Sequence, residues 1–256
     1  MKAVEIFNYL YALSGVTLTK TQDVCKAGDP EREVKKIATT MFPTVKVLKE
    51  TLAWGADLLI VHEPIYFNHC DEHSDEAVEM AKRALIEKSG LTIYRYHDYS
   101  HCVIPDVIAK GVVDKIAFKG EIEYNDYLTA TIKLQKAQTA KEMGQVLKER
   151  LQLQNIRLCG NCDFKTQNVV FIPGAAGWGR LKNDNNTIFI MGEICEWAYA
   201  EYVRDAAELG WRKALIILGH GGSEREGMRY TAQLLKDKFQ DIDIRYFETE
   251  EAFFPL

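Results

Sequence analysis

The segment KALIILGHGGSEREGM, residues 213–228, is the part of the sequence from which the rest of the chain can be interpreted. Its first part is mostly apolar, which is typical of a buried strand, and the polar part that follows is typical of a helix. Ser223 and Glu226 have the spacing of a capping box, which predicts that the helix begins at Glu224. His220 then lies at the carboxyl end of a strand, close to a carboxylate in the next helix. A histidine and a carboxylate in this arrangement are suitable ligands for a divalent metal ion.

The rest of the chain alternates short strands with helices. In the first part we expect strands at 36–42, 57–61 and 91–96, and helices at 1–13, 43–54, 74–90 and 105–111. After two β-rich stretches within 115–134, we expect helices at 139–151, 197–209 and 228–239, and strands at 156–159, 168–172, 187–191, 213–218 and 243–247. Repeated strand–helix units favour mainly parallel sheets with helices on their faces. We therefore expect two interlinked α/β lobes, residues 1–120 and 121–256, with a metal site between the lobes.

Composition and charge argue against several classes of protein. A net charge of −5 provides no electrostatic attraction for nucleic acid or for an anionic membrane. No apolar run approaches the length of a membrane span, and residues 1–8 lack the layout of a signal peptide, so we expect a cytoplasmic protein. The six cysteines in 256 residues do not form the pattern of a disulfide framework.

All six histidines follow predicted strands. They are His62, His69 and His73 after strand 57–61, His97 and His101 after strand 91–96, and His220 after strand 213–218. Ligands collect at the carboxyl ends of the strands in parallel α/β sheets, so these three loops could share one site. With Glu63 and Glu224 they offer enough nitrogen and oxygen donors for two divalent ions. The alternative is that each histidine is an ordinary loop residue with a single hydrogen bond; their grouping favours the metal site.

Two weaker patterns have ordinary explanations. Cys159 and Cys162 have CxxC spacing, but a single pair predicts structural or incidental thiols rather than a zinc site. The glycine-bearing loop 174–179 follows a strand and could present amide groups to a phosphate. A tight turn between a strand and a helix explains the loop equally well.

Two segments resemble the signatures of a known family. GADLLIVHEP, residues 55–64, and GHGGSEREGM, residues 219–228, are similar to the two signature segments of the Nif-three-like family, whose members carry the name GTP cyclohydrolase type 2. The resemblance covers nearly the whole chain in the same order. It implies a dinuclear centre with two divalent metal ions per chain (iron, zinc or manganese) and a homo-hexameric assembly.

Carried over by position, the resemblance implies the metal ligands His62, Glu63, His101, His220 and Glu224. The family usually has His in place of Glu63 and Asp in place of His101, so the two exchanges keep three imidazoles and two carboxylates. It usually has Asp and His in place of Glu193 and Glu196, and its Trp-Asp-Asn segment is not visible in residues 21–28. These departures indicate different substrate contacts. We expect His97 to orient a ligand from outside the coordination sphere, and Glu196 to be a candidate general base.

The resemblance predicts a metal-dependent hydrolase that acts on a nucleotide or a phosphoester, because bound metal ions activate water and polarise the bond to be cleaved. The alternative is a non-enzymatic metal-binding or metal-delivery scaffold, which would need the ligands but no general base. The expected partner is a small-molecule substrate such as a nucleotide, with no nucleic-acid or membrane partner.

Overall fold

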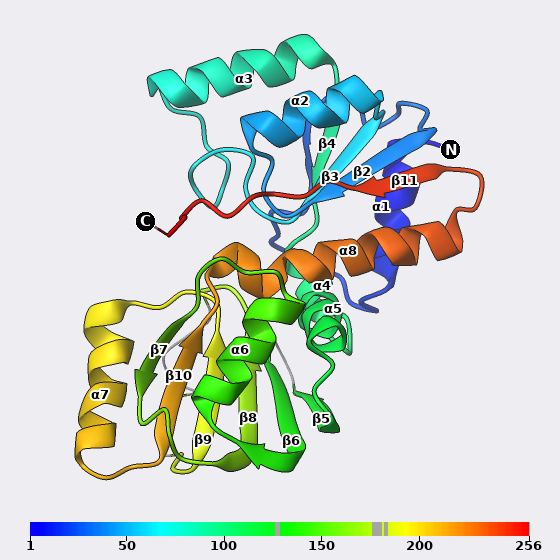
Figure 1. Ribbon diagram of the computed structural model, residues 1–256. Helices are drawn as coiled ribbons and strands as arrows, with labels where there is room; N and C mark the ends of the chain where they lie inside the picture. The colour runs from blue at the N-terminus through cyan, green and yellow to red at the C-terminus, as the bar shows by residue number, and fades with distance from the viewer. Residues whose placement is uncertain (126–128, 176–180, 182–183, 256) are drawn as a thin grey trace. The chain divides into compact units, whose positions relative to one another are not determined.

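The computed structural model describes residues 1–125, 129–175, 181 and 184–255 (Figure 1). The chain divides into two compact units. Unit 1 consists of Met1–Val107 and Gly227–Thr249, and unit 2 consists of Ile108–Glu226 and Glu250–Leu256. Each unit contains one β-sheet flanked by helices, so the predicted α/β fold is confirmed. In the described part of the chain, no helix combines the length and the apolar composition needed to cross a membrane.

Unit 1 is built on a five-stranded sheet with the order β1-β4-β3-β2-β11. Its strands are β1 (Cys25–Ala27), β2 (Lys36–Thr40), β3 (Leu58–Val61), β4 (Thr92–Arg95) and β11 (Asp243–Tyr246). All neighbouring strands are parallel except β1 and β4, as the strand–helix alternation predicts. The helices are α1 (Ala3–Ala12), α2 (Val45–Trp54), α3 (Ala77–Ser89), α4 (Asp98–Cys102) and the second part of α8 (His220–Lys238).

Helices cover both faces of this sheet. Figure 1 shows α2 and α3 on one face, and α1 with the C-terminal part of α8 on the other. Val47 of α2 and Ile86 of α3 belong to the same core cluster as Leu59 of β3. On the opposite face, Phe7 of α1 stacks on Tyr94 of β4 with ring centroids 3.5 Å apart. Because both faces are covered, β3 is an uninterrupted apolar run and all four of its residues are buried.

Unit 2 is built on a six-stranded sheet with the order β5-β6-β8-β9-β10-β7. Its strands are β5 (Gly120–Asn125), β6 (Thr129–Gln138), β7 (Arg157–Gly160), β8 (Thr166–Ile172), β9 (Thr187–Met191) and β10 (Lys213–Ile217). The three strands β8, β9 and β10 are parallel, whereas β5, β6 and β7 pair in antiparallel fashion. The sheet is therefore mixed, with a parallel centre.

The helices of unit 2 bury the two faces of this sheet. They are α5 (Val107–Ile116), α6 (Ala140–Arg150), the π-helical turn Glu196–Ala200, α7 (Glu201–Glu208) and the first turns of α8. Met143 and Leu147 of α6 pack with Ile216 of β10 in one cluster. Val203 of α7 packs with Leu215 of β10 in the cluster on the other face. The alternation of side chains along β10 thus supplies both cores.

Helix α8 begins at His220, so the predicted start at Glu224 is wrong. Ser223 lies inside the helix, and its hydroxyl donates to the carbonyl oxygen of His220 at 2.7 Å. The Ser and Glu residues have the spacing of a capping box, but the glycines that precede them join the helix. The short elements β1 and α4 were not predicted, because three and five residues are too few for a periodic pattern to show.

The close approach of Gly28 to β4 yields the first prediction. Its backbone has φ +79°, and an added Cβ would lie 2.6 Å from the carbonyl oxygen of Leu91 and 2.6 Å from Cα of Thr92. We expect Gly28→Ala to lower the free energy of unfolding by roughly 2–4 kcal/mol, because overpacking adds to the strain of a left-handed backbone. Urea unfolding measures this change.

Gly15→Ala is the matched control, because Gly15 has φ +67° and nothing lies within 4 Å of an added Cβ. It should lose only the conformational part, about 1–2 kcal/mol. Equal losses in the two variants would contradict the contribution of the contact with β4.

Candidate functional site

Three histidines come together at one edge of the sheet in unit 1. His62 follows β3, His97 follows β4, and His101 lies in α4. One ligand atom from each lies within 4.8 Å of those of the other two. The ring centroids are 4.7 Å apart for His62 and His97, 5.1 Å for His62 and His101, and 5.0 Å for His97 and His101. Because β3 and β4 are parallel neighbours, their carboxyl ends place these loops side by side.

Each of the three rings makes a hydrogen bond through Nδ1. His62 Nδ1 lies 3.0 Å from the carbonyl oxygen of Tyr96. His97 Nδ1 lies 2.8 Å from Oδ1 of Asp98, and His101 Nδ1 lies 2.8 Å from Oδ2 of Asp106. These acceptors assign the proton of each neutral ring to Nδ1, so Nε2 carries the lone pair. A metal-binding histidine almost always donates a hydrogen bond from its other ring N–H to a carboxylate, a carbonyl group or water in this way.

Asp23 and Asp98 hold the start of α4 in place. The buried carboxylate of Asp23 accepts hydrogen bonds from the backbone N–H groups of residues 97–99, at 2.8, 3.1 and 2.8 Å. Burial raises the pKa of this carboxyl group, and the three N–H donors act in the opposite direction. Asp98 in turn accepts from the Thr21 hydroxyl at 2.7 Å and from the Gln22 amide at 2.9 Å. Its hydrogen bond with His97 lowers the pKa of the Asp98 carboxyl group.

Glu63 is the third predicted ligand that unit 1 contains, beside His62 and His101. It directly follows His62 and is buried, with 8% of its surface exposed. One of its carboxylate oxygens lies within 4.8 Å of a ring nitrogen of His62. The structure therefore brings Glu63 close to His62, and it groups His97 with His62 and His101. The role of His97 in orienting a ligand stays a prediction.

Unit 2 brings His220 and Glu224 together in the first turns of α8. Their i,i+4 spacing puts both side chains on one face of the helix. His220 Nε2 lies 3.1 Å from Oε2 of Glu224, which is 3% exposed. His220 Nδ1 lies 3.2 Å from Oε1 of Glu193, so carboxylates contact both nitrogens of this ring. In the sequence, Glu193 stands out only as a departure from the family pattern; the structure gives it a direct contact with His220.

Gly174 lies against this pair. An added Cβ at Gly174 would lie 2.3 Å from Oε1 of Glu224 and 3.4 Å from Nε2 of His220. The amide of Gly174 donates to the Ser223 hydroxyl at 2.9 Å. A Cβ at Gly192 would lie 2.4 Å from both the Gly174 carbonyl oxygen and the Ser223 hydroxyl. Both glycines are thus required for the backbone to approach α8, while residues 176–179 of the predicted phosphate loop lie outside the described residues.

The remaining predicted residues lie in more exposed or less reactive surroundings. Glu196 begins the π-helical turn and forms an ion pair with Arg157, with 65% of its side chain exposed. Its role as a general base stays a prediction. Cys159 and Cys162 are free, half-buried thiols, and burial raises the pKa of both. A raised pKa lowers the thiolate fraction and therefore the reactivity.

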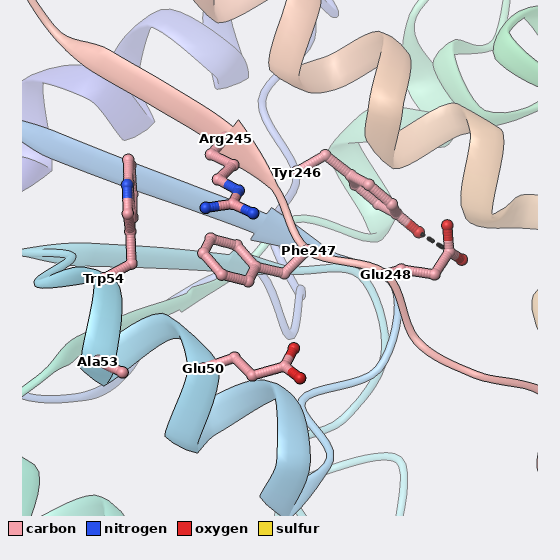
Figure 2. A pocket seen from close by; sticks show the side chains of 7 residues that line it. All are labelled: Glu50, Ala53, Trp54, Arg245, Tyr246, Phe247 and Glu248. Carbon is pink, nitrogen blue, oxygen red and sulfur yellow. Dashed lines mark hydrogen bonds between the residues drawn. The ribbon is translucent and has the colours of Figure 1, made fainter.

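A surface pocket in unit 1 contains none of the predicted ligands. Figure 2 shows it between α2 and the end of β11, lined by Glu50, Ala53, Trp54, Arg245, Tyr246, Phe247 and Glu248. The Arg245 guanidinium lies 5.0 Å from the centre of the Phe247 ring, and the Trp54 and Phe247 rings are 5.6 Å apart. Such contacts stabilise the edge of the sheet, and no lining residue is a histidine or a cysteine.

Sequence reasoning missed the acceptors that orient the histidines. Asp106 lies five residues after His101, a spacing that is common and carries no specific signal. Asp23 is separated from His97 by more than seventy residues, so its contact depends on β1 pairing with β4. The adjacency of His97 and Asp98 was the one local signal in the sequence.

Known proteins are similar to this chain over most of its length. A "GTP cyclohydrolase 1 type 2 homolog" of Clostridium perfringens is 22% identical over 265 residues, covering 98% of this chain and 97% of that protein. A homolog of the same name from Clostridium acetobutylicum is 24% identical over 236 residues, covering 88% of this chain and 85% of that protein.

Solved structures show the same fold. Protein SA1388 of Staphylococcus aureus has a TM-score of 0.79 at 16% identity, and covers 100% of this chain and 99% of its own. The ybgI protein, described as of unknown function, has a TM-score of 0.76 at 20% identity, and covers 98% of this chain and 99% of its own. At sequence identities this low, the similarity to these structures shows a shared fold only.

The family comparison covers residues 1–252 and matches Duf34/NIF3. Since this match takes in nearly the whole sequence, the chain belongs to the Duf34/NIF3 (NGG1p interacting factor 3) family.

Proposed function

We propose that this protein binds divalent metal ions and is a metal-dependent hydrolase of a nucleotide or phosphoester. The observation that supports it best is the group His62, His97 and His101, in which Nδ1 of every ring has an acceptor and every Nε2 carries a lone pair. Three imidazole nitrogens with ordered hydrogen-bond partners fit a divalent transition metal. Divalent ions at such donors supply Lewis acidity toward a phosphoryl or carbonyl oxygen.

Neighbouring side chains orient these donors by hydrogen bonds. Asp98 and Asp106 hold two imidazoles by carboxylate hydrogen bonds, which fixes the orientation of both rings. In unit 2, Glu193 contacts Nδ1 of His220, and the buried Glu224 supplies a carboxylate. Imidazole-rich donor sets suit zinc and iron better than manganese, which prefers carboxylates and water. Two ions per chain, a homo-hexamer and a nucleotide substrate are parts of the same proposal, and the names of the relatives support the last.

A non-enzymatic metal-binding or metal-delivery scaffold is the second candidate. The position of Glu196 favours it, because the residue predicted as general base forms an exposed ion pair with Arg157. A scaffold would keep the metal ligands and need no base.

Metal content is the first test of the proposal. Elemental analysis of the purified protein should find about two ions per chain, of zinc or iron. The His101→Ala and His220→Ala variants should contain less metal, because each lacks a side chain that contributes to the free energy of metal binding. His73→Ala is the matched control, since His73 packs on Tyr66 and is not one of the predicted ligands. A wild-type protein that lacks metal and also refuses added zinc, iron and manganese would contradict the proposal.

The protonation of the rings is a second test. Nitrogen-15 NMR of the metal-free protein, above the pH at which the rings lose their second proton, should show the Nδ1–H tautomer for His62, His97 and His101. Asp106→Ala should abolish this preference at His101 alone. An Nε2–H tautomer at His101 in the wild type would show that the ring does not present Nε2 to a metal.

Turnover separates the enzyme from the scaffold. With metal restored, nucleotides and model phosphoesters should be hydrolysed, and Glu224→Gln should lower the rate by more than about 100-fold, since even the partners of ligands are worth about 10–100-fold. Equal, background-level rates in the wild type and in Glu224→Gln would leave the scaffold as the function.

A further inference from the structure

Arg95, the last residue of β4, is a buried cation. Its guanidinium group contacts the loop that follows β3, in which the predicted ligands His62 and Glu63 lie. The residue has 0% of its surface exposed. Its Nε donates to the carbonyl oxygen of His62 at 3.1 Å, and its Nη1 donates to the carbonyl oxygen of His69. One side chain therefore binds the backbone at both ends of the segment 62–69.

A buried guanidinium needs a counter-charge, and Asp71 supplies it. Asp71 Oδ2 lies 3.8 Å from Nη1 of Arg95 and 3.0 Å from Nζ of Lys26, and the three side chains are 3%, 0% and 8% exposed. Asp71 Oδ1 also accepts the N–H of Tyr66 at 3.1 Å. Since removing charges from water is costly unless they are paired, this arrangement resists displacement of any member.

The charge of Asp71 also acts on a third buried cation. Lys82 of α3 is 6% exposed, and its ammonium group lies 5.3 Å from the centre of the Phe67 ring. Burial lowers the pKa of Lys82 to about 8, and the charge of Asp71 opposes this shift. Asp71 thus links side chains from β1 and β4 to the loop that follows β3.

His62 is held from two sides as a result. Arg95 binds the backbone carbonyl group of His62. Tyr96, which directly follows Arg95, accepts the hydrogen bond of the His62 ring through its carbonyl oxygen. With both the backbone and Nδ1 fixed, Nε2 has one direction in which to point.

We infer that Arg95 is a positioning residue for the metal group formed by His62, His97 and His101. It binds the His62 and His69 carbonyls, with Asp71 as its counter-charge, and so orients the His62 imidazole toward the other two rings. The inference rests on the proposed metal function. An arginine suits this role because its planar fork presents N–H groups to two carbonyl oxygens in fixed directions, whereas the ammonium group of lysine is a compact charge with rotatable donors.

Titration with Co²⁺, followed by visible absorption, tests the inference in the full-length protein. Arg95→Met should weaken Co²⁺ binding about 10–100-fold, the usual effect of removing a group that orients a ligand, and should change the absorption spectrum of the bound ion. Arg95→Lys should restore part of the affinity, since it keeps the charge and one donor direction.

Arg32→Met is the matched control. Arg32 also donates to a backbone carbonyl, that of Gly90 at 2.7 Å, and pairs with Asp57 at 3.4 Å, but neither partner belongs to the metal group. It should leave Co²⁺ affinity within about twofold of the wild type, because partly exposed ion pairs contribute little. Equal Co²⁺ affinity and spectra in Arg95→Met and in the wild type would overturn the inference.

A metal-free readout separates this inference from the proposed function. In Arg95→Met without metal, the His62 ring should lose its Nδ1–H tautomer, while His101, held by Asp106, keeps it. A wild type that binds no Co²⁺ refutes the metal function, and the tautomer of His62 still decides the role of Arg95. If Arg95→Met does not fold, Co²⁺ affinity and the His62 tautomer are measured in Arg95→Lys and Asp71→Asn instead. Wild-type values of both quantities in both variants would overturn the inference.

Discussion

The candidate site of unit 1 depends on the hydrogen bonds that the histidine rings donate from Nδ1. An imidazole can turn about its bond to the backbone and can carry its proton on either nitrogen, so a histidine in a loop has no fixed lone-pair direction. The Tyr96 carbonyl, Asp98 and Asp106 remove this freedom for His62, His97 and His101. Because each acceptor lies on the side of the ring away from Nε2, the three lone pairs can meet.

The backbone near these histidines is itself held by buried charges. Asp23 binds three successive backbone N–H groups at the start of α4, and Arg95 binds two carbonyl groups after β3. Charges buried in this way are costly, and their hydrogen bonds offset the cost only in one geometry. The stability of the sheet edge and the precision of the donor group therefore have the same physical origin.

Unit 2 reaches the same kind of order by a different means, the absence of side chains. Gly174, which follows β8, and Gly192, which follows β9, let the backbone approach the first turns of α8 more closely than any Cβ would permit. The Ser223 hydroxyl then links the Gly174 amide to the His220 carbonyl. The His220 ring is placed between two carboxylates, Glu193 and Glu224, which give it directed contacts through both nitrogens.

Much of this protein could be predicted from its sequence. Apolar runs such as residues 57–61 and 213–218 indicate buried strands, and the histidines that follow them indicate a metal site, because period and position along a strand are local properties. The i,i+4 pair His220 and Glu224 is equally local, which is why its predicted proximity survived the error in the start of α8. The resemblance of two segments to a known family extended this to nearly the whole chain.

Only the tertiary structure decided how the donors are oriented and which distant residues orient them. β11, near the end of the sequence, pairs with β2 of unit 1, and Asp23 and Arg95 contact the histidine loops because β1, β3 and β4 are neighbours in the same sheet. A hydrogen bond depends on distance and angle in space, and neither is encoded by the spacing of residues along the chain. The sequence by itself determined which groups could bind a metal; the fold determined where their lone pairs point.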